Sequence, residues 1–262
     1  MTYQWDAADY EKHSSPQQQW ARDVIKTLQL AGVRRMLDIG CGDGKVTAEL
    51  TALVPKASVL GIDSSKTMIQ FARDKFPPSR FPNLQFRIED ATALAYDGEF
   101  DLIVSFSSLH WVKDHIAVLR GIRRGLAPHG RTMLQFGGKG NAALITAVTH
   151  ELITREPWND YFEGFTHPWF FYSVEEYSEF IDRVGLSARR VELIPKDMVL
   201  DGKEGLKGWL RAVFLPFTER VPEALRGDFV DEIALTYVAR CPPDNKGRVH
   251  VQMIRLEVEA TL

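Results

Sequence analysis

Hydrophobic and polar positions repeat along this chain with two different periods. Short apolar runs, which predict buried strands, lie at residues 36–39, 59–63, 84–91, 100–105 and 131–136. Between these runs apolar residues recur every three or four positions, for example across residues 113–126, which predicts amphipathic helices. Because strands that alternate with helices usually form parallel sheets, the pattern predicts an α/β fold. We expect a sixth strand at residues 186–194 and a last one at residues 247–258.

Several predicted helices begin or end at residues with a known capping preference. The expected starts are Ser15 followed by Pro16, Ser64 or Ser65, Asn141, and a capping box of Ser173 with Glu176. Gly185 is expected to end the helix that this capping box begins, and a further helix is expected to run from Pro222 through Tyr237.

The first predicted strand runs into three alternating glycines, Gly40, Gly42 and Gly44, and then into a helical pattern. Glycine is needed where the backbone takes a positive φ or approaches a ligand closely, and the amides of the following helix point at that ligand. The sequence therefore predicts a ligand above residues 40–45.

An acid, Asp38, stands just before these glycines and bears on which ligand they bind. A nicotinamide enzyme would carry Gly-x-Gly-x-x-Gly, whereas this turn reads Gly-x-Gly-x-Gly. Asp38 would repel a dinucleotide phosphate and would attract a cationic ammonium or sulfonium. S-adenosylmethionine carries both cations, which favours it over a dinucleotide.

Two more predicted strands end in acids that suit a nucleoside. Asp63 lies 19 positions beyond Gly44, about where an acid that binds both ribose hydroxyls is expected. Asp90 follows the next strand and can accept a hydrogen bond from the adenine amino group.

With these residues the chain resembles the class I S-adenosylmethionine-dependent methyltransferases, in the segments LDIGCGDGK, GIDSS, EDA and FDLIVSFSSLHWV. The resemblance implies a Rossmann-like, doubly wound, mostly parallel sheet of seven strands whose last strand is antiparallel. It also implies that S-adenosyl-L-methionine is the cofactor and S-adenosyl-L-homocysteine the product; a Rossmann-like domain with incidental acids is the alternative. The residues expected at the cofactor are Tyr10, Gln18, Asp38, Gly40, Cys41, Gly42, Gly44, Asp63, Ser64, Met68, Asp90, Ala91 and Ser105.

The same resemblance implies that residues 1–30 form a lid over the cofactor, with contacts at Tyr10, Gln17, Gln18 or Gln19. Alternatively, these glutamines form a solvated first turn of the helix. Residues 106–111 follow the fourth strand, and loops at the carboxyl ends of parallel strands line the ligand crevice. We therefore expect His110 and Trp111, in that loop, to hold the methyl acceptor; the alternative is that they only pack its rim.

Eight aromatic residues fall within residues 156–172, which is too aromatic for a solvated linker. We interpret this segment as a cap over an apolar acceptor pocket, with Trp169 and Phe171 at the substrate. A buried support or a dimer face is the alternative. In this interpretation one methyltransferase domain comprises a cofactor-binding core at residues 31–140 and helical cap segments at residues 141–184 and 195–245.

The carboxyl-terminal part resembles the trans-aconitate methyltransferases in its WL, P and RVPEALR segments, and the LHW loop resembles juvenile hormone acid methyltransferases. Both groups methylate carboxylates, which implies O-methylation of a small-molecule carboxylate. By the same resemblance Gln18 or Gln19 and Trp111 would donate hydrogen bonds to it.

His110 would be a third donor, or the general base if the acceptor is a hydroxyl, an amine or a carbon acid. Arg211 and Arg255 are candidates for binding further anionic groups, or else form surface salt bridges. The alternatives are N- or C-methylation of a metabolite and a non-catalytic, cofactor-binding partner protein.

Composition does not indicate the substrate, but it argues against several kinds of partner and site. The chain has 262 residues, a net charge of −3 and no Lys/Arg run, so nucleic acid is not an implied partner. Two cysteines, Cys41 and Cys241, lack the spacing of a metal site or a disulfide framework, which is typical of a reduced, cytoplasmic protein. We expect no metal, no membrane segment, and a monomer or homodimer.

Overall fold

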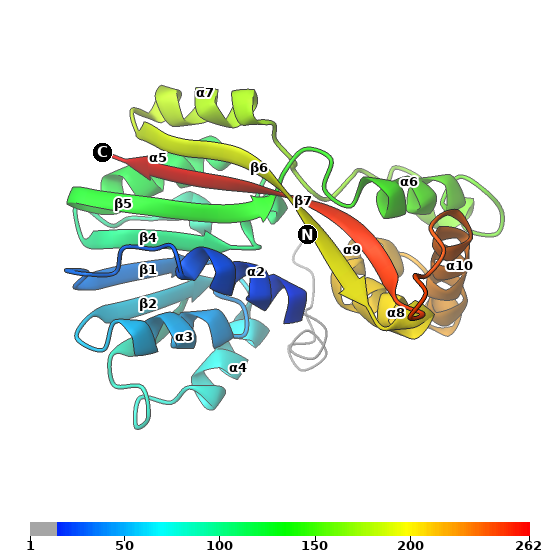
Figure 1. The fold of residues 1–262 in the computed structure, drawn as a ribbon, viewed down its shortest axis with the longest axis horizontal. Coiled ribbons are helices and arrows are strands. Elements are labelled where there is room, and N and C mark those ends of the chain that lie inside the picture. Colours follow the sequence, from blue (N-terminus) through cyan, green and yellow to red (C-terminus); the bar gives the residue numbers. More distant parts are fainter. Residues whose placement is uncertain (1–14) are drawn as a thin grey trace.

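Seven strands of the described chain, residues 15–262 of a computed structural model, form one mixed sheet in the order β3-β2-β1-β4-β5-β7-β6 (Figure 1). Strands β1 to β5 run parallel to one another, and β7 runs antiparallel between β5 and β6. The predicted Rossmann-like sheet with an antiparallel last strand is therefore confirmed. The strands are β1 (Arg35–Ile39), β2 (Ser58–Asp63), β3 (Leu84–Ile88), β4 (Phe100–Phe106), β5 (Leu126–Gly137), β6 (Ser187–Leu200) and β7 (Val249–Thr261).

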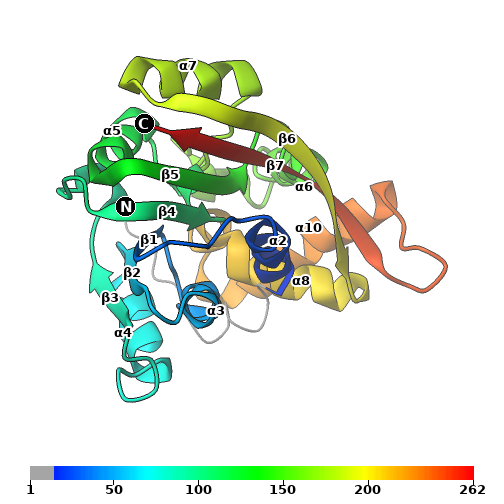
Figure 2. The same ribbon diagram turned by 60° about the vertical axis from the view of Figure 1, so that its left-hand side comes forward.

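Helices cover both faces of the sheet because each carries one apolar stripe that must be buried. On one face lie α2 (Ser15–Ile25), α3 (Lys45–Leu53) and α4 (Lys66–Lys75). On the other face lie α5 (His115–Gly125) and α7 (Val174–Val184), which contact each other (Figure 2). Among residues 15–262 no helix is long and apolar enough to cross a membrane.

The remaining helices form a cap beside the sheet, at the right of Figure 1. They are α6 (Ala143–Leu152), α8 (Gly202–Val213), α9 (Leu215–Thr218) and α10 (Arg226–Arg240), with the short turns η3 (Asn159–Phe162) and η4 (Glu223–Leu225). Strands β6 and β7 run on beyond the sheet and bring Met198, Val251 and Met253 into the apolar core of the cap. Helix α7, which lies within the cap segment expected to end at residue 184, packs on the sheet and not in this core.

Strand β6 is longer than expected, ending at Leu200 instead of residue 194. Its polar second half pairs with β7 as far as Leu200 with Val249, so one face of the pair stays solvated while the other packs on the cap. The last long helix begins at Arg226, after the short turn η4, and not at Pro222. In both places long-range pairing or a local turn overrides what the sequence pattern indicated.

Most of the predicted helix ends are confirmed. The Ser65 hydroxyl accepts a hydrogen bond from the Met68 amide, and Ser173 with Glu176 forms the capping box. Gly185 ends α7 in the left-handed conformation, with φ 74°. Helix α2 begins at Ser15, one residue before the predicted first position.

The predicted cap at Asn141 is wrong. Helix α6 begins at Ala143, behind Ala142 in the left-handed conformation, without a side-chain cap bond. Instead, the Asn141 side-chain oxygen accepts a hydrogen bond from the Ile254 amide at 3.1 Å. Asn141 therefore joins the start of the cap to β7.

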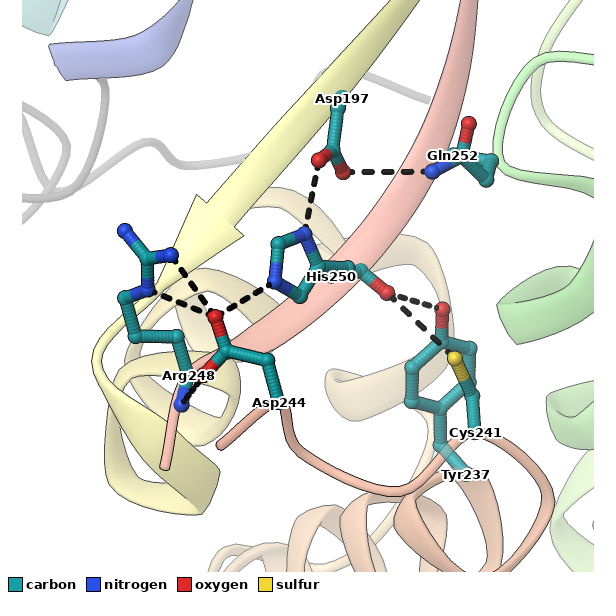
Figure 3. A network of polar contacts seen from close by, with 7 residues as sticks. All are labelled: Asp197, Tyr237, Cys241, Asp244, Arg248, His250 and Gln252. Atoms are coloured by element: carbon teal, nitrogen blue, oxygen red, sulfur yellow. Dashed lines mark hydrogen bonds and ion pairs between the residues drawn. The ribbon is translucent and has the colours of Figure 1, made fainter. Parts of the chain in front are cut away.

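A polar clamp holds the far end of the β6–β7 ribbon (Figure 3). The His250 ring lies between two carboxylates, with Nδ1 2.7 Å from Asp197 and Nε2 3.2 Å from Asp244. Arg248 donates to the same Asp244 at 2.7 Å, and the Tyr237 hydroxyl donates to the His250 carbonyl at 2.8 Å. Hydrogen bonds to Asp197 and then Asp244 raise the pKa of His250. We call Asp197, Asp244, Arg248 and His250 the His250 clamp.

Candidate active site

The turn between β1 and α3 depends on glycine at the three predicted positions. Gly40, Gly42 and Gly44 have φ angles of 72°, 54° and 78°, where a side chain is strained. A Cβ at Gly40 would collide with the Ser108 side chain, and one at Gly44 would lie 2.7 Å from the Phe86 ring. Around Gly42 no described atom lies within 4 Å of that position. Gly40 and Gly42 line a cavity, whereas Gly44 packs behind the turn.

Asp63 connects this turn to the end of β2. Its two carboxylate oxygens accept hydrogen bonds from the Gly42 amide at 3.0 Å and the Ser65 amide at 2.8 Å. Burial raises the pKa of Asp63, and the amides of Ser65 and Gly42 oppose that rise. Because a carboxylate offers about four acceptor sites, Asp63 can still accept bonds from a ligand in the cavity.

Asp38 is 2 % exposed at the end of β1 and lines the same cavity. The Thr47 hydroxyl donates to it at 2.7 Å. Burial raises the pKa of Asp38 to about 7, with the Thr47 bond opposing the rise and the charge of Asp63 adding to it. No described cation pairs with this carboxylate, so a cationic ligand beside it would favour the ionised form.

The third expected acid, Asp90, lies on the same wall of the cavity. One of its oxygens accepts bonds from both the amide and the hydroxyl of Thr92, each at 2.8 Å. Ser64, Met68 and Ala91 line this wall as well. The three strand-terminal acids therefore meet at one edge of the sheet, as the order of the strands predicted.

Ser105, which we expected at the cofactor, is fully buried and does not reach the cavity. Its hydroxyl donates to the Ile39 carbonyl at 2.8 Å and bonds Ser108 at 2.9 Å, which joins the end of β4 to β1. The two serines that follow, Ser107 and Ser108, line the cavity in its place. The chain turns at Ser107, which has a φ of 56°, so the serines after the turn face the cavity and Ser105 does not.

The first turn of α2 brings two glutamines to the cavity, Gln17 and Gln18. Gln18 also donates to Glu49 at 2.5 Å, whereas the side-chain oxygen of Gln17 is buried without a partner among the described residues. Gln19, our expected substrate ligand, is exposed and donates to Asp23 at 3.0 Å. The structure therefore brings Gln17 to the cavity and not Gln19. Tyr10 lies outside the described residues.

The short turn η2 (Leu109–Trp111) places His110 and Trp111 in the middle of the cavity lining. The Gly137 amide donates to His110 Nδ1 at 3.4 Å, which assigns the ring proton to Nε2. Burial, followed by the positive charge of Arg255, lowers the pKa of His110 well below its usual value. His110 is therefore a neutral imidazole at pH 7, with one N–H to donate.

Aromatic rings form the far wall. Trp169 meets Trp111 edge-to-face, with ring centres 5.6 Å apart, and stacks on Phe171 at 6.0 Å. The Phe170 amide donates to the His110 carbonyl at 2.9 Å, which ties this wall to η2. Both predicted aromatic substrate residues, Trp169 and Phe171, line the cavity.

Arg255, on β7, is the buried cation of the cavity lining, at 2 % exposed. Its guanidinium donates to the Ser107 hydroxyl at 2.8 Å and lies over the Trp20 ring, 5.2 Å from the ring centre. Arg211, the other arginine candidate, is exposed on α8 and does not line the cavity.

The cavity that these residues line has a volume of about 900 Å³ and runs from the glycine turn to the cap. Sequence reasoning did not single out several residues of its cap end, because helical or alternating spacing does not tell which residues of a cap segment face a cavity, and Asn141 was expected to cap a helix. These residues are Asn141, Trp209, Val213, Phe214 and Met253.

Comparison with known proteins agrees with this geometry. The profile of a family described as a methyltransferase domain matches residues 36–130. A trans-aconitate 2-methyltransferase from Deinococcus radiodurans is 30 % identical over 239 residues, which cover 87 % of each chain. The chain belongs to the class I S-adenosylmethionine-dependent methyltransferases. An uncharacterized methyltransferase from Schizosaccharomyces pombe is 27 % identical over 228 residues, 84 % of each chain.

Solved structures share the fold of this methyltransferase at lower identity. The YcgJ protein from Bacillus subtilis superposes with a TM-score of 0.62 at 18 % identity, covering 92 % of this chain and 97 % of the other. A Haemonchus contortus phosphoethanolamine N-methyltransferase in complex with S-adenosyl-L-methionine superposes with a TM-score of 0.61 at 16 % identity, covering 97 % of this chain and 56 % of the other. The family thus implies S-adenosylmethionine as the cofactor.

Proposed function

We propose that this methyltransferase O-methylates a carboxylate group of a small molecule. The cofactor would occupy the end of the cavity nearest the glycine turn, and the acceptor would occupy the end under the cap. His110 and Trp111 lie between the two ends.

The residues at the cofactor end fit S-adenosylmethionine. Asp38 is a buried carboxylate that lacks a cationic partner among the described residues, and the ammonium of the cofactor would supply one. Asp63 would accept the ribose hydroxyls and Asp90 the adenine amino group, with Met68 against the adenine ring. When bound, the cofactor supplies an electrophilic methyl group whose sulfur leaving group needs no proton.

The surroundings of His110 support the choice of acceptor, because the ring is buried and the Gly137 amide occupies its Nδ1. A general base works best with a pKa near the operating pH, but the pKa of His110 is held far below that range. A hydroxyl or an ammonium acceptor would need such a base. A carboxylate, with an ordinary pKa of about 4, is already deprotonated at neutral pH and needs none.

The same residues can orient a carboxylate. His110 Nε2–H and the Arg255 guanidinium are donors, and the aromatic wall excludes water from one side. Holding reactants in a near-attack geometry can remove about 7 to 11 kcal/mol of a barrier. In this proposal alignment, and not proton transfer, is what His110, Trp111 and Arg255 contribute.

The names of several relatives support this choice. Six relatives that are 26–30 % identical are trans-aconitate 2-methyltransferases, whose name specifies a carboxylic acid as acceptor. The proposal extends only the carboxylate to this chain, not the particular acid.

A panel of carboxylic acids, amines and phenols with methyl-labelled cofactor tests the proposal. We expect methyl esters from one or more acids, and at least a tenfold loss of kcat/KM for that acid in Arg255→Gln, since a bond to a charged group is worth about 1.5 to 3 kcal/mol. Arg211→Gln, an exposed arginine on the cap, is the matched control and should keep wild-type turnover.

If the label is transferred to amines or phenols and not to acids, the proposal is wrong. The enzyme would then be an N-methyltransferase or an O-methyltransferase of a neutral acceptor. Cofactor binding without turnover on any member of the panel would support a non-catalytic partner protein.

A further inference from the structure

A second cavity, of about 700 Å³, lies between the end of α2 and strands β5, β7 and β6. It is separate from the first cavity, with which it shares no lining residue among those described. Its lining is strongly charged. The charged side chains are Asp23, Arg131, Arg189, Arg190, Lys196, Glu257 and Glu259.

A β-bulge concentrates arginines in this cavity. Consecutive residues of a regular strand point to opposite faces, so Arg189 and Arg190 should diverge. The register between β6 and β7 shifts between Ala188 and Arg190, and both arginines line the cavity. A bulge of this kind leaves one residue unpaired in the sheet and changes the direction of a side chain.

Each acid of the cavity lies near a cation, and Glu257 and Glu259 share one. Arg190 lies 2.7 Å from Glu257 and 3.7 Å from Glu259. Asp23 lies 3.3 Å from Lys26 and 4.0 Å from Lys196. The guanidinium groups of Arg131 and Arg189 take no part in these pairs.

Arg131 and Arg189 have no acidic partner within residues 15–262. The Nη2 atom of Arg131 is buried and makes no hydrogen bond there, and the same holds for the Thr261 hydroxyl. Arg131 and Thr261 are register partners on adjacent strands, so the two unsatisfied groups lie together. Burying a donor without an acceptor raises the free energy of the folded state. This indicates that a ligand with several acceptor oxygens binds to these two groups.

We propose that the second cavity binds a phosphate group, either free or carried by a small phosphorylated molecule. Guanidinium groups bind phosphate oxygens in pairs, and a threonine hydroxyl supplies a further donor. Arg131 and Thr261 form the base of the site, and the exposed Arg189 closes over it from the bulge. The volume exceeds that of one phosphate, and the oxygens of Glu257 and Glu259 are within the same cavity to accept hydroxyl groups of the carrier.

Calorimetric titration of the full chain with inorganic phosphate, at low ionic strength and with saturating S-adenosylhomocysteine, tests this site. S-adenosylhomocysteine then fills the cofactor end of the first cavity, and phosphate should still bind with one site per chain. Ribose 5-phosphate and succinate are the other two probes. Tighter binding of ribose 5-phosphate than of phosphate identifies a phosphorylated molecule as the ligand, whereas equal binding identifies free phosphate.

Arg131→Gln and Arg189→Gln should each weaken phosphate binding at least tenfold. Arg120→Gln, an exposed arginine on α5 across the sheet, removes the same charge and should leave the affinity unchanged. Because Arg189 is exposed, its variant keeps the test valid even if Arg131→Gln fails to fold. Equal affinities in all three variants, no saturable binding, or tighter binding of succinate than of either phosphate would overturn the proposal.

Discussion

The two ends of the large cavity are lined by different kinds of residue, polar at one end and aromatic at the other. At the glycine turn, Asp63 and Asp90 each accept a hydrogen bond from the amide two residues further along the chain. Asp63 also accepts one from the Gly42 amide, in the turn after the neighbouring strand. Under the cap, rings dominate, and Trp169 is held by Trp111 and Phe171. The first end is pre-organised by hydrogen bonds and the second by packing.

This difference indicates where specificity can change. A cofactor that is the same throughout a family requires fixed donors and acceptors, which short local segments can supply. The proposed acceptor pocket, lined by rings from α8 and the loop before α7, can be reshaped by changing one side chain at a time. Substitutions at the two ends should therefore separate cofactor affinity from turnover.

The largest effect is expected at Asp63. Asp63→Ala removes the proposed acceptor for the ribose hydroxyls and also the partner of the Gly42 and Ser65 amides. We expect S-adenosylhomocysteine affinity to fall by about 1 to 3 kcal/mol, measured by calorimetry. Asp74→Ala, an exposed acid on α4, is the control and should bind as wild type. Unchanged affinity in the Asp63 variant would remove this residue from the cofactor site.

A smaller effect, confined to turnover, is expected at Trp111. Trp111→Phe keeps an aromatic ring against Trp169 but removes the indole N–H, so kcat should fall about tenfold while cofactor affinity changes less than about twofold. Trp158→Phe is the matched control, since its indole donates to Glu232 in the cap, away from the cavity. Equal turnover in the Trp111 variant and wild type would assign Trp111 to the rim.

Asp38 gives the cofactor end a pH dependence that the acceptor end lacks. With a pKa of about 7, its carboxylate is mostly protonated at pH 6 and mostly ionised at pH 7.5. Because a cationic ligand prefers the ionised form, S-adenosylmethionine affinity should rise roughly eightfold over that interval. Asp38→Asn should flatten the profile. A wild-type profile as flat as that of Asp38→Asn would show that Asp38 does not face the cation.

The cofactor end could be predicted from sequence because its geometry is local. Strand ends, glycines and caps lie within a few residues of one another, so Asp38, Asp63 and Asp90 could be placed without knowing any distant contact. The errors there are errors of two positions. Gln19 was expected where Gln17 lies, because side chains turn about 100° per residue on a helix. Ser105 was expected where Ser107 lies, because the chain turns away from the strand at Ser107, which has a φ of 56°.

The acceptor end could be predicted only in part, because it depends on distant pairing. Arg255 reaches the cavity because β7 runs antiparallel beside β5, which pairs Arg255 with Gly137. Nothing in the segment around residue 255 fixes that register. Asn141 likewise finds its partner Ile254 more than 100 positions away. A helical or alternating pattern indicates that such residues are buried, but not which cavity they face.

The smallest effect is expected at the His250 clamp, which holds the β6–β7 ribbon where it supports the cap. Its carboxylate partners raise the pKa of His250 in the folded state above the ordinary value of about 6.5, so the clamp stabilises the fold fully below that value. The stabilisation is lost as the pH rises through the folded pKa. His250→Gln should therefore lower Tm more at pH 5.5 than at pH 9. Arg248→Gln removes the other donor to Asp244 and is the control, so its Tm loss should depend less on pH. If the Tm loss of His250→Gln were the same at both pH values, the imidazole would contribute packing and no charge. Protonation of His250 would then not stabilise the ribbon that supports the cap.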